Sequence, residues 1–135
     1  MARVPAHPRL AHMLLKGCEW GLEELACQVA AVLGEGDSRR SKRADLHHRL
    51  ERLSSREQQQ SRRFHDLCKG FVLESVEEKP RPGSKGSSEE RVGLLLAAAY
   101  PDRIAKRRQA KGNVYQLANG RSAALDETDS LCREE

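Results

Sequence analysis

The strongest constraint on the fold is a pair of helical apolar patterns within His7–Gly34. The first pattern places Leu10, Met13 and Leu14 at the i, i+3, i+4 spacing of one helix face, just after Pro8, a residue well tolerated in a first helical turn. The second pattern, which follows two interrupting glycines and ends before a helix-stopping glycine, consists of Leu22, Leu25, Ala26, Val29, Val32 and Leu33. Two amphipathic helices joined by a short connection predict a helical hairpin whose apolar stripes must be buried against the rest of the chain.

Helical character continues through the middle of the chain. Asp45 is placed to cap a third helix, and leucines follow it at helical spacing. Ser54 and Glu57 have the spacing of a capping box, which marks a fresh helix start before the run REQQQSRRFHDLCKGF. The pattern leaves open whether residues 45–72 form one kinked helix or two.

A change of composition separates this region from the next apolar segment. Residues 74–88 contain the run KPRPGSKGSS, rich in proline, glycine and serine, which predicts a flexible connector. Ser87 and Glu90 again have capping-box spacing. The segment Val92–Tyr100 is apolar nearly all round, so we expect this helix at the centre of a helical bundle, with Leu95 in the core.

The apolar period changes near the C-terminus. Pro101 is expected to open a short helix that runs through Ile104 and ends in the basic run KRR. Beyond it, Asn119-Gly120 separates two runs of strand character, which predicts a β-hairpin with a type I′ turn, because both central residues of that turn need positive φ. The two runs are Val114–Ala118 and Arg121–Leu125. A lone hairpin is marginal in water, so we expect it to begin a larger β-domain.

Composition agrees with a mainly α-helical bundle followed by a C-terminal hairpin. Aromatic residues make up only 4% of the 135 residues, which fits helices packed through Leu, Ala and Val better than a β-sandwich. The formal net charge of +4 permits nucleic-acid binding without requiring it. The sequence has no apolar run of about 18 residues and no apolar signal core near its start, so we expect a cytoplasmic protein without a membrane span.

The spacing of cysteines and histidines does not indicate a metal centre. The cysteines are Cys18, Cys27, Cys68 and Cys132, and the histidines are His7, His12, His47, His48 and His65. Neither CxxC nor HExxH occurs. We therefore expect the thiols to serve as small apolar or surface groups, with a disulfide or metal ligation as the alternatives.

Two blocks of the sequence resemble one family of helicases. The run HPRLAHMLLKG, which starts at His7 and is followed by an alanine-rich helix, resembles the start of the helicase-associated, or ratchet, domain of DEAH/DExH-box helicases. The runs YPDRIAKRR (Tyr100–Arg108) and VYQLANGRSAALDETDSL (Val114–Leu131) resemble the passage from ratchet domain to OB-fold, closest to the bacterial HrpB-type ATP-dependent RNA helicases. This resemblance implies a ratchet-like domain over residues 1–100, and a junction helix with a partial OB-like hairpin over residues 101–135.

The sequence lacks the motifs of a helicase motor. Neither GxxxxGK[ST] nor DExH occurs, and the nearest glycine-rich stretch, Gly83–Gly86, has the wrong spacing to cradle a phosphate. We therefore expect this chain by itself neither to bind nor to hydrolyse ATP. The resemblance implies that ATP and Mg²⁺ belong to two RecA-like motor domains of a longer parent chain.

The resemblance further implies an accessory region that packs on the motor domains and helps to form a channel for single-stranded RNA or another nucleic acid. Its candidate contacts are the cations of two basic runs: Arg39, Arg40, Lys42, Arg43, Arg103, Lys106, Arg107 and Arg108. A run like the first is most often a solvated loop, and contact with phosphates is its second interpretation.

Stacking platforms for bases are scarce in this sequence. Trp20, Tyr100 and Tyr115 are each expected to pack in the core or the hairpin, so we expect any binding of single-stranded RNA to be weak. The alternative function is a helical protein–protein interaction module that does not bind nucleic acid.

Overall fold

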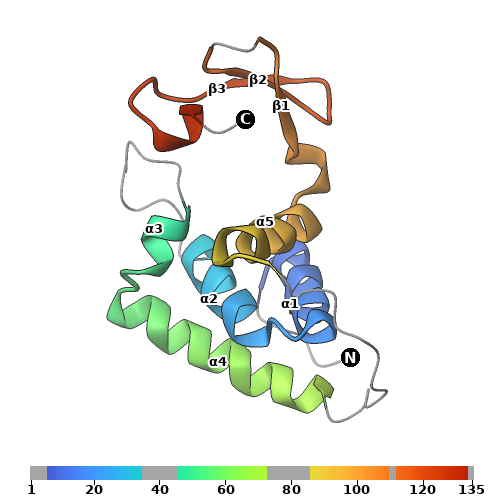
Figure 1. Ribbon diagram of the computed structural model, residues 1–135. Helices are drawn as coiled ribbons and strands as arrows, with labels where there is room; N and C mark the ends of the chain where they lie inside the picture. The colour runs from blue at the N-terminus through green and yellow to red at the C-terminus, as the bar shows by residue number, and fades with distance from the viewer. Residues whose placement is uncertain (1–5, 35–45, 73–85, 110–111, 134–135) are drawn as a thin grey trace.

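The computed structural model describes residues 6–34, 46–72, 86–109 and 112–133. Within these residues the helices are α1 (Pro8–Trp20), α2 (Glu23–Gly34), α3 (Leu46–Leu50), α4 (Ser55–Val72) and α5 (Ser88–Ala99). They are followed by the 3-10 turn η2 (Pro101–Arg103), the strands β1 (Ala105–Arg107), β2 (Val114–Leu117) and β3 (Ser122–Ala124), and the 3-10 turn η3 (Ser130–Arg133). The helices pack together, and the small sheet lies to one side of them, connected through α5 and η2 (Figure 1). The mainly α-helical class is confirmed.

The predicted hairpin of α1 and α2 is confirmed, and glycine determines its geometry. Helix α1 ends at Gly21, whose φ of 70° lies in the left-handed region that favours glycine. Within α1, Gly17 lies so close to α2 that an added Cβ would be 2.5 Å from the Cβ of Ala26. The two helix backbones can therefore approach closely because both contact positions carry very small residues.

Helix α2, rather than α5, is the central element of the bundle. It packs against α1, α3, α4 and α5, and its buried residues are Ala26, Cys27, Val29, Ala30, Ala31 and Val32. Helix α5 buries one face, while Gly93 is exposed and Leu94 is 38% exposed. The expectation that the segment Val92–Tyr100 lies at the centre is therefore wrong. Because glycine and alanine carry little apolar area, an apolar helix built from them can leave one side in water at small cost.

Two capping boxes start the later helices, as the sequence predicts. The backbone N–H of Ser54 donates to the Glu57 carboxylate (2.7 Å), and the backbone N–H of Glu57 donates to the Ser54 hydroxyl (3.3 Å). The pair Ser87 and Glu90 forms the same arrangement at the start of α5. The region 45–72 thus contains two helices, α3 and α4. The proposed cap Asp45 and most of the connector 74–88 lie outside the described residues.

The C-terminal sheet has one strand more than the sequence indicated. Strands β1, β2 and β3 are antiparallel in that order, and the register aligns Lys106 with Gln116 and Gln116 with Ser122. The expectation of a helix ending in KRR is wrong, because η2 stops at Arg103 and Lys106 lies in β1. Pairing with β1 supplies the partner strand that an isolated hairpin lacks.

The hairpin exists, but its turn is not type I′. Among the described residues only glycines have positive φ, so Asn119 does not meet the requirement of that turn. Gly120 has a φ of 83°, and its backbone N–H donates to the Leu117 carbonyl at 2.9 Å. The Leu117 N–H in turn donates to the Arg121 carbonyl at 2.8 Å, which encloses a three-residue loop ending in a left-handed glycine.

The Gly17 contact predicts opposite effects for one substitution at two helical glycines. Gly17→Ala should destabilise the protein by about 1–3 kcal/mol, because the added methyl overlaps Ala26. Gly93→Ala should stabilise it by up to about 1 kcal/mol, because an added Cβ there has no atom within 4 Å and alanine favours the helix. Urea denaturation measures both, and a Gly17→Ala variant as stable as Gly93→Ala would contradict the close packing of α1 on α2.

Adjacent leucines of α5 provide a second comparison. Leu95 is fully buried, whereas its neighbour Leu94 is 38% exposed. Leu95→Ala should therefore lower the free energy of unfolding by about 2–5 kcal/mol. Leu94→Ala, which removes the same atoms from a partly solvated site, should cost less than about 1 kcal/mol. Equal losses in the two variants would show that α5 is turned differently on the bundle.

Candidate nucleic-acid interface

An ion pair joins the first helix to the start of the sheet region. The Arg9 guanidinium, in the first turn of α1, donates to both carboxylate oxygens of Asp102 in η2, at 2.7 and 3.4 Å. This is the parallel, two-bond geometry in which arginine binds carboxylates most specifically. The two residues are 93 positions apart, and they belong to the two blocks, HPRL and YPDR, that carry the helicase resemblance.

The ring of Tyr100 lies beside this pair. Arg9 and Arg103 each place a guanidinium carbon over the ring, 5.4 and 5.2 Å from its centroid. Both distances are within the range of a cation–π interaction. Tyr100 is also the C-cap of α5 and packs against the hydrophobic core, as expected for this aromatic residue. The Arg103 side chain is therefore held against the Tyr100 ring, at the junction between α5 and η2, and does not extend freely into solvent.

The junction also controls the ionisation of its carboxyl group. Hydrogen bonding from the Arg9 guanidinium holds the pKa of Asp102 below its usual range, and the charges of Arg9 and Arg103 add to this effect. Both side chains of the ion pair are 40% exposed, so water screens their attraction. The pair therefore aligns η2 on α1 more than it strengthens the fold.

One face of the sheet presents two exposed cations. Strand alternation places Lys106 and the flanking Arg108 on the same face of the sheet, and Arg108 continues the pairing through its N–H to the Val114 carbonyl at 3.2 Å. Val114 is 41% exposed, and Ile104, two positions before Lys106, is 55% exposed. The same face carries the exposed residues Gln116 and Ser122, aligned with Lys106. We refer to these residues, 104, 106, 108, 114, 116 and 122, as the basic sheet face.

The opposite face is occupied by the chain itself. The Arg107 guanidinium donates to the Tyr115 hydroxyl (3.1 Å) and to the Cys132 carbonyl (2.8 Å), and lies 5.5 Å from the Tyr115 ring centroid. The Tyr115 hydroxyl donates to the Leu131 carbonyl at 3.3 Å. Arg107 and Tyr115 thus fasten η3 to the sheet, a contact that the sequence pattern did not reveal. Among the predicted cations, Arg107 is the one with an intramolecular role in holding the C-terminal turn.

The other basic run lies beyond the part of the chain that can be described. Arg39, Arg40, Lys42 and Arg43 all fall within residues 35–45. Of the two runs, the structure describes only the second. Arg103 lies in η2, Lys106 and Arg108 lie on one face of the sheet, and Arg107 lies on the other.

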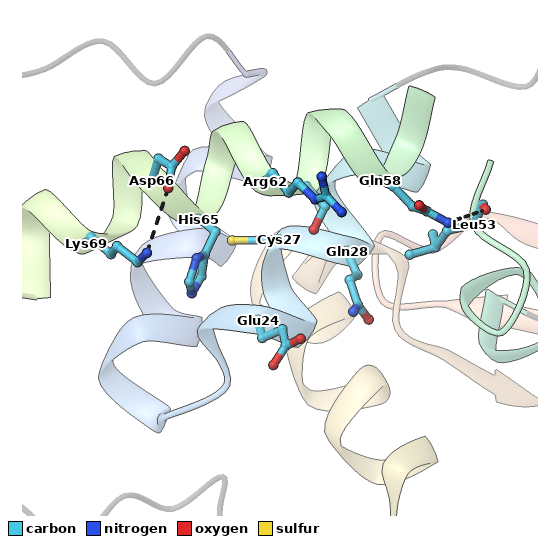
Figure 2. Close-up of a pocket in the computed structure, with 10 residues that line it drawn as sticks. Glu24, Cys27, Gln28, Leu53, Gln58, Arg62, His65, Asp66 and Lys69 are labelled. Carbon is cyan, nitrogen blue, oxygen red and sulfur yellow. Dashed lines mark hydrogen bonds and ion pairs between the residues drawn. The ribbon is translucent and has the colours of Figure 1, made fainter. Parts of the chain in front are cut away.

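An open groove of about 670 Å³ lies between α2 and α4 (Figure 2). Its charged side chains have both signs: Arg62 and Lys69 on α4 face the same groove as Glu24 on α2. Asp66 adds a second carboxylate, 3.8 Å from the Lys69 ammonium. The sequence did not single out this groove, because its lining comes from two helices far apart in the chain. Its mixed charge gives it no preference for anions.

Within residues 6–34, 46–72, 86–109 and 112–133, no group of three or more His, Cys, Asp and Glu side chains is arranged to hold a metal ion. Those ranges also contain no helix with the length and apolar character needed to cross a membrane.

These features define a helical module that carries a small sheet with a basic face. Over all 135 residues, the chain is 37% identical to the "ATP-dependent RNA helicase HrpB" of Escherichia coli (strain K12). It spans 15% of the length of that relative. The chain is therefore similar, along its whole length, to one segment of an ATP-dependent RNA helicase. No family model and no solved structure matches it.

The helicase resemblance drawn from the sequence is thereby supported. The finer assignment, to a ratchet domain followed by the start of an OB-fold, stays a prediction.

The Arg9–Asp102 pair predicts a specific change in ionisation. In Arg9→Ala the pKa of Asp102 should rise toward the usual value of about 3.9, because the main hydrogen-bond donor to the ionised form is gone. In the unaltered protein, the stability that this pair contributes is complete above that value and is lost as the pH falls through the lowered pKa of Asp102. An NMR pH titration of the side-chain carboxyl groups measures the shift.

Asp126 is the internal control for this titration. Hydrogen bonds from the Thr128 hydroxyl and backbone N–H hold the pKa of Asp126 low, independently of Arg9. The pKa of Asp126 should therefore be the same in Arg9→Ala as in the unaltered protein. An unchanged pKa of Asp102, or equal shifts at both carboxyl groups, would contradict the described junction.

Proposed function

We propose that this chain is a non-motor accessory region of an ATP-dependent RNA helicase, and that its basic sheet face contacts the backbone of single-stranded RNA. The observation that carries the proposal is the exposed pair Lys106 and Arg108 on one face of the sheet. Neither cation forms an ion pair with a residue in the described ranges, so both are available to phosphates. Each phosphate neutralised by a cation releases counterions, and this release is the main source of non-specific affinity for nucleic acid.

The apolar residues of the same face suit a single strand better than a duplex. Ile104 and Val114 leave about half of their surface in water next to the cations, where unstacked bases could cover them. Gln116 and Ser122 add hydrogen-bonding groups beside Lys106. The face has no aromatic platform, because the Tyr115 ring lies on the opposite side with Arg107. The expected binding is therefore weak and largely independent of base sequence.

In the parent protein, this region would act together with the rest of the chain. We propose that the helices form the ratchet-like domain, that the sheet is the first part of an OB-fold, and that the helices pack on RecA-like motor domains. ATP and Mg²⁺ would bind to those motor domains, since this sequence lacks their phosphate-binding loop. A cytoplasmic location fits such a helicase.

An interaction module that does not bind nucleic acid is the competing function. Its support is the exposure of two large apolar side chains on the helices, Leu15 at 41% and Leu94 at 38%. Scattered exposed leucines are common on protein surfaces, whereas the two cations of the basic sheet face lie on one strand and its extension. The latter arrangement therefore supports the first function more strongly.

The experiment is a titration of fluorescent single-stranded RNA with the unaltered chain and two double variants. Lys106→Ala/Arg108→Ala should weaken binding by roughly tenfold or more at 50 mM salt, and should reduce the slope of log K against log salt by about 1.4, or about 0.7 for each lost phosphate contact. The matched control is Arg62→Ala/Arg63→Ala, which removes the same charge from exposed positions of α4.

The control variant should bind RNA as tightly as the unaltered chain does. Equal weakening in both double variants would mean that only net charge matters, which would rule out a specific role for the basic sheet face. Binding that is undetectable at 20 mM salt would favour the interaction module.

A further inference from the structure

Three thiols from three different helices meet inside the bundle. Cys18 comes from α1, Cys27 from α2 and Cys68 from α4, and all three are free thiols. The sulfurs of Cys27 and Cys68 are 4.0 Å apart, and both side chains are buried, with exposed fractions of 0% and 5%. The 41 positions between these two residues mean that only the tertiary fold brings them together.

The surroundings of Cys18 and Cys68 keep these two thiols protonated. Hydrogen bonding with Cys68, together with burial, raises the pKa of the Cys18 thiol. Cys18 lowers the pKa of Cys68 through its hydrogen bond, but the hydrogen bond with Cys27 and burial outweigh this effect and raise the pKa of Cys68 to about 11. Because the thiolate is the reactive form, Cys18 and Cys68 should react only slowly with oxidants at neutral pH.

We propose that Cys27 and Cys68 are a latent cross-link, which peroxide closes into a disulfide that ties α4 to α2. The sulfur of one cysteine attacks the O–O bond of hydrogen peroxide, which forms a sulfenic acid and releases one water. The sulfur of the second cysteine then displaces the sulfenic oxygen, which leaves with a proton as a second water. Two thiols and one peroxide thus become one disulfide and two waters, and the two electrons lost by the sulfurs reduce the peroxide.

The geometry requires only a small movement. A disulfide has an S–S length of about 2.05 Å, so the two sulfurs must approach by roughly 2 Å, a distance that side-chain rotation and a small shift of α4 can supply. Cys27 lies beneath the groove between α2 and α4 and points toward α4 (Figure 2). A fluctuation that lifts α4 would admit peroxide through this groove to Cys27, which is the one of the three thiols that lines it.

The cross-link would hold α2 and α4 at a constant separation, which would fix the width of the groove between them. It would also constrain the unfolded chain by closing a long loop, which is the main way in which disulfides stabilise proteins. This device is independent of the basic sheet face, because it lies within the helical bundle and its closure can be measured without RNA.

The test treats the full 135-residue chain with millimolar hydrogen peroxide. The remaining thiols are then alkylated under denaturing conditions, and mass spectrometry is done without reduction. Cleavage after glutamate is needed, because Glu19, Glu23 and Glu24 separate Cys18 from Cys27. The expected product joins the peptides of Cys27 and Cys68 with the loss of two hydrogens. The Tm should rise on the order of 10 °C, and dithiothreitol should reverse both changes.

Variants distinguish this link from other oxidation. Cys27→Ala and Cys68→Ala should each abolish the cross-link and the rise in Tm, whereas Cys132→Ser, which alters the thiol near the sheet, should retain both. Where an alanine variant folds poorly, the peptide map of the Cys132→Ser protein decides alone. A link between Cys18 and Cys68, or oxidation confined to Cys132, would overturn the proposal.

Discussion

The close approach of α1 and α2 is the contact on which the rest of the bundle depends. Gly17 and Ala26 have such small side chains that the backbones of α1 and α2 pack closely. Helices α4 and α5 pack against this pair, so that α2 is enclosed by its neighbours. Leu14 and Leu95 are then fully or almost fully buried in one core. In such a core, small residues allow the helices to pack closely, and a few leucines supply buried apolar area.

A cluster of Arg9, Tyr100, Asp102 and Arg103 connects this bundle to the sheet. Arg9 reaches from the first turn of α1 to Asp102, and the Tyr100 ring lies beside both Arg9 and Arg103. The sheet that follows has two different faces, since Arg107 is engaged with η3 while Lys106 is directed to solvent. Two neighbouring cations of one basic run therefore differ in role, one in an intramolecular contact and one exposed, because successive side chains of a strand lie on opposite faces of the sheet.

Similarity to a segment of an ATP-dependent RNA helicase gives these features a context. The two blocks that resemble the helicase family are the two that meet at the Arg9–Asp102 pair, so the resemblance coincides with a physical contact. In the proposed function, the junction holds the basic sheet face at a constant position relative to the helices. This arrangement would favour weak contacts with the RNA backbone, because a face that is already held in position loses less conformational entropy on binding.

Local features of this protein could be read from the sequence alone, because each depends on residues a few positions apart. They include the α1–α2 hairpin, the capping boxes at Ser54 and Ser87, and the position, although not the type, of the turn at Gly120. The cations Lys106 and Arg108 could be listed as candidates in the same way. Tertiary structure decided that α2 rather than α5 is central, that KRR enters a strand, and that Arg107 serves η3. It also decided that Arg9 meets Asp102 and that Cys27 meets Cys68. These outcomes depend on which surfaces pack together across long stretches of chain, and local propensity carries no information about that choice.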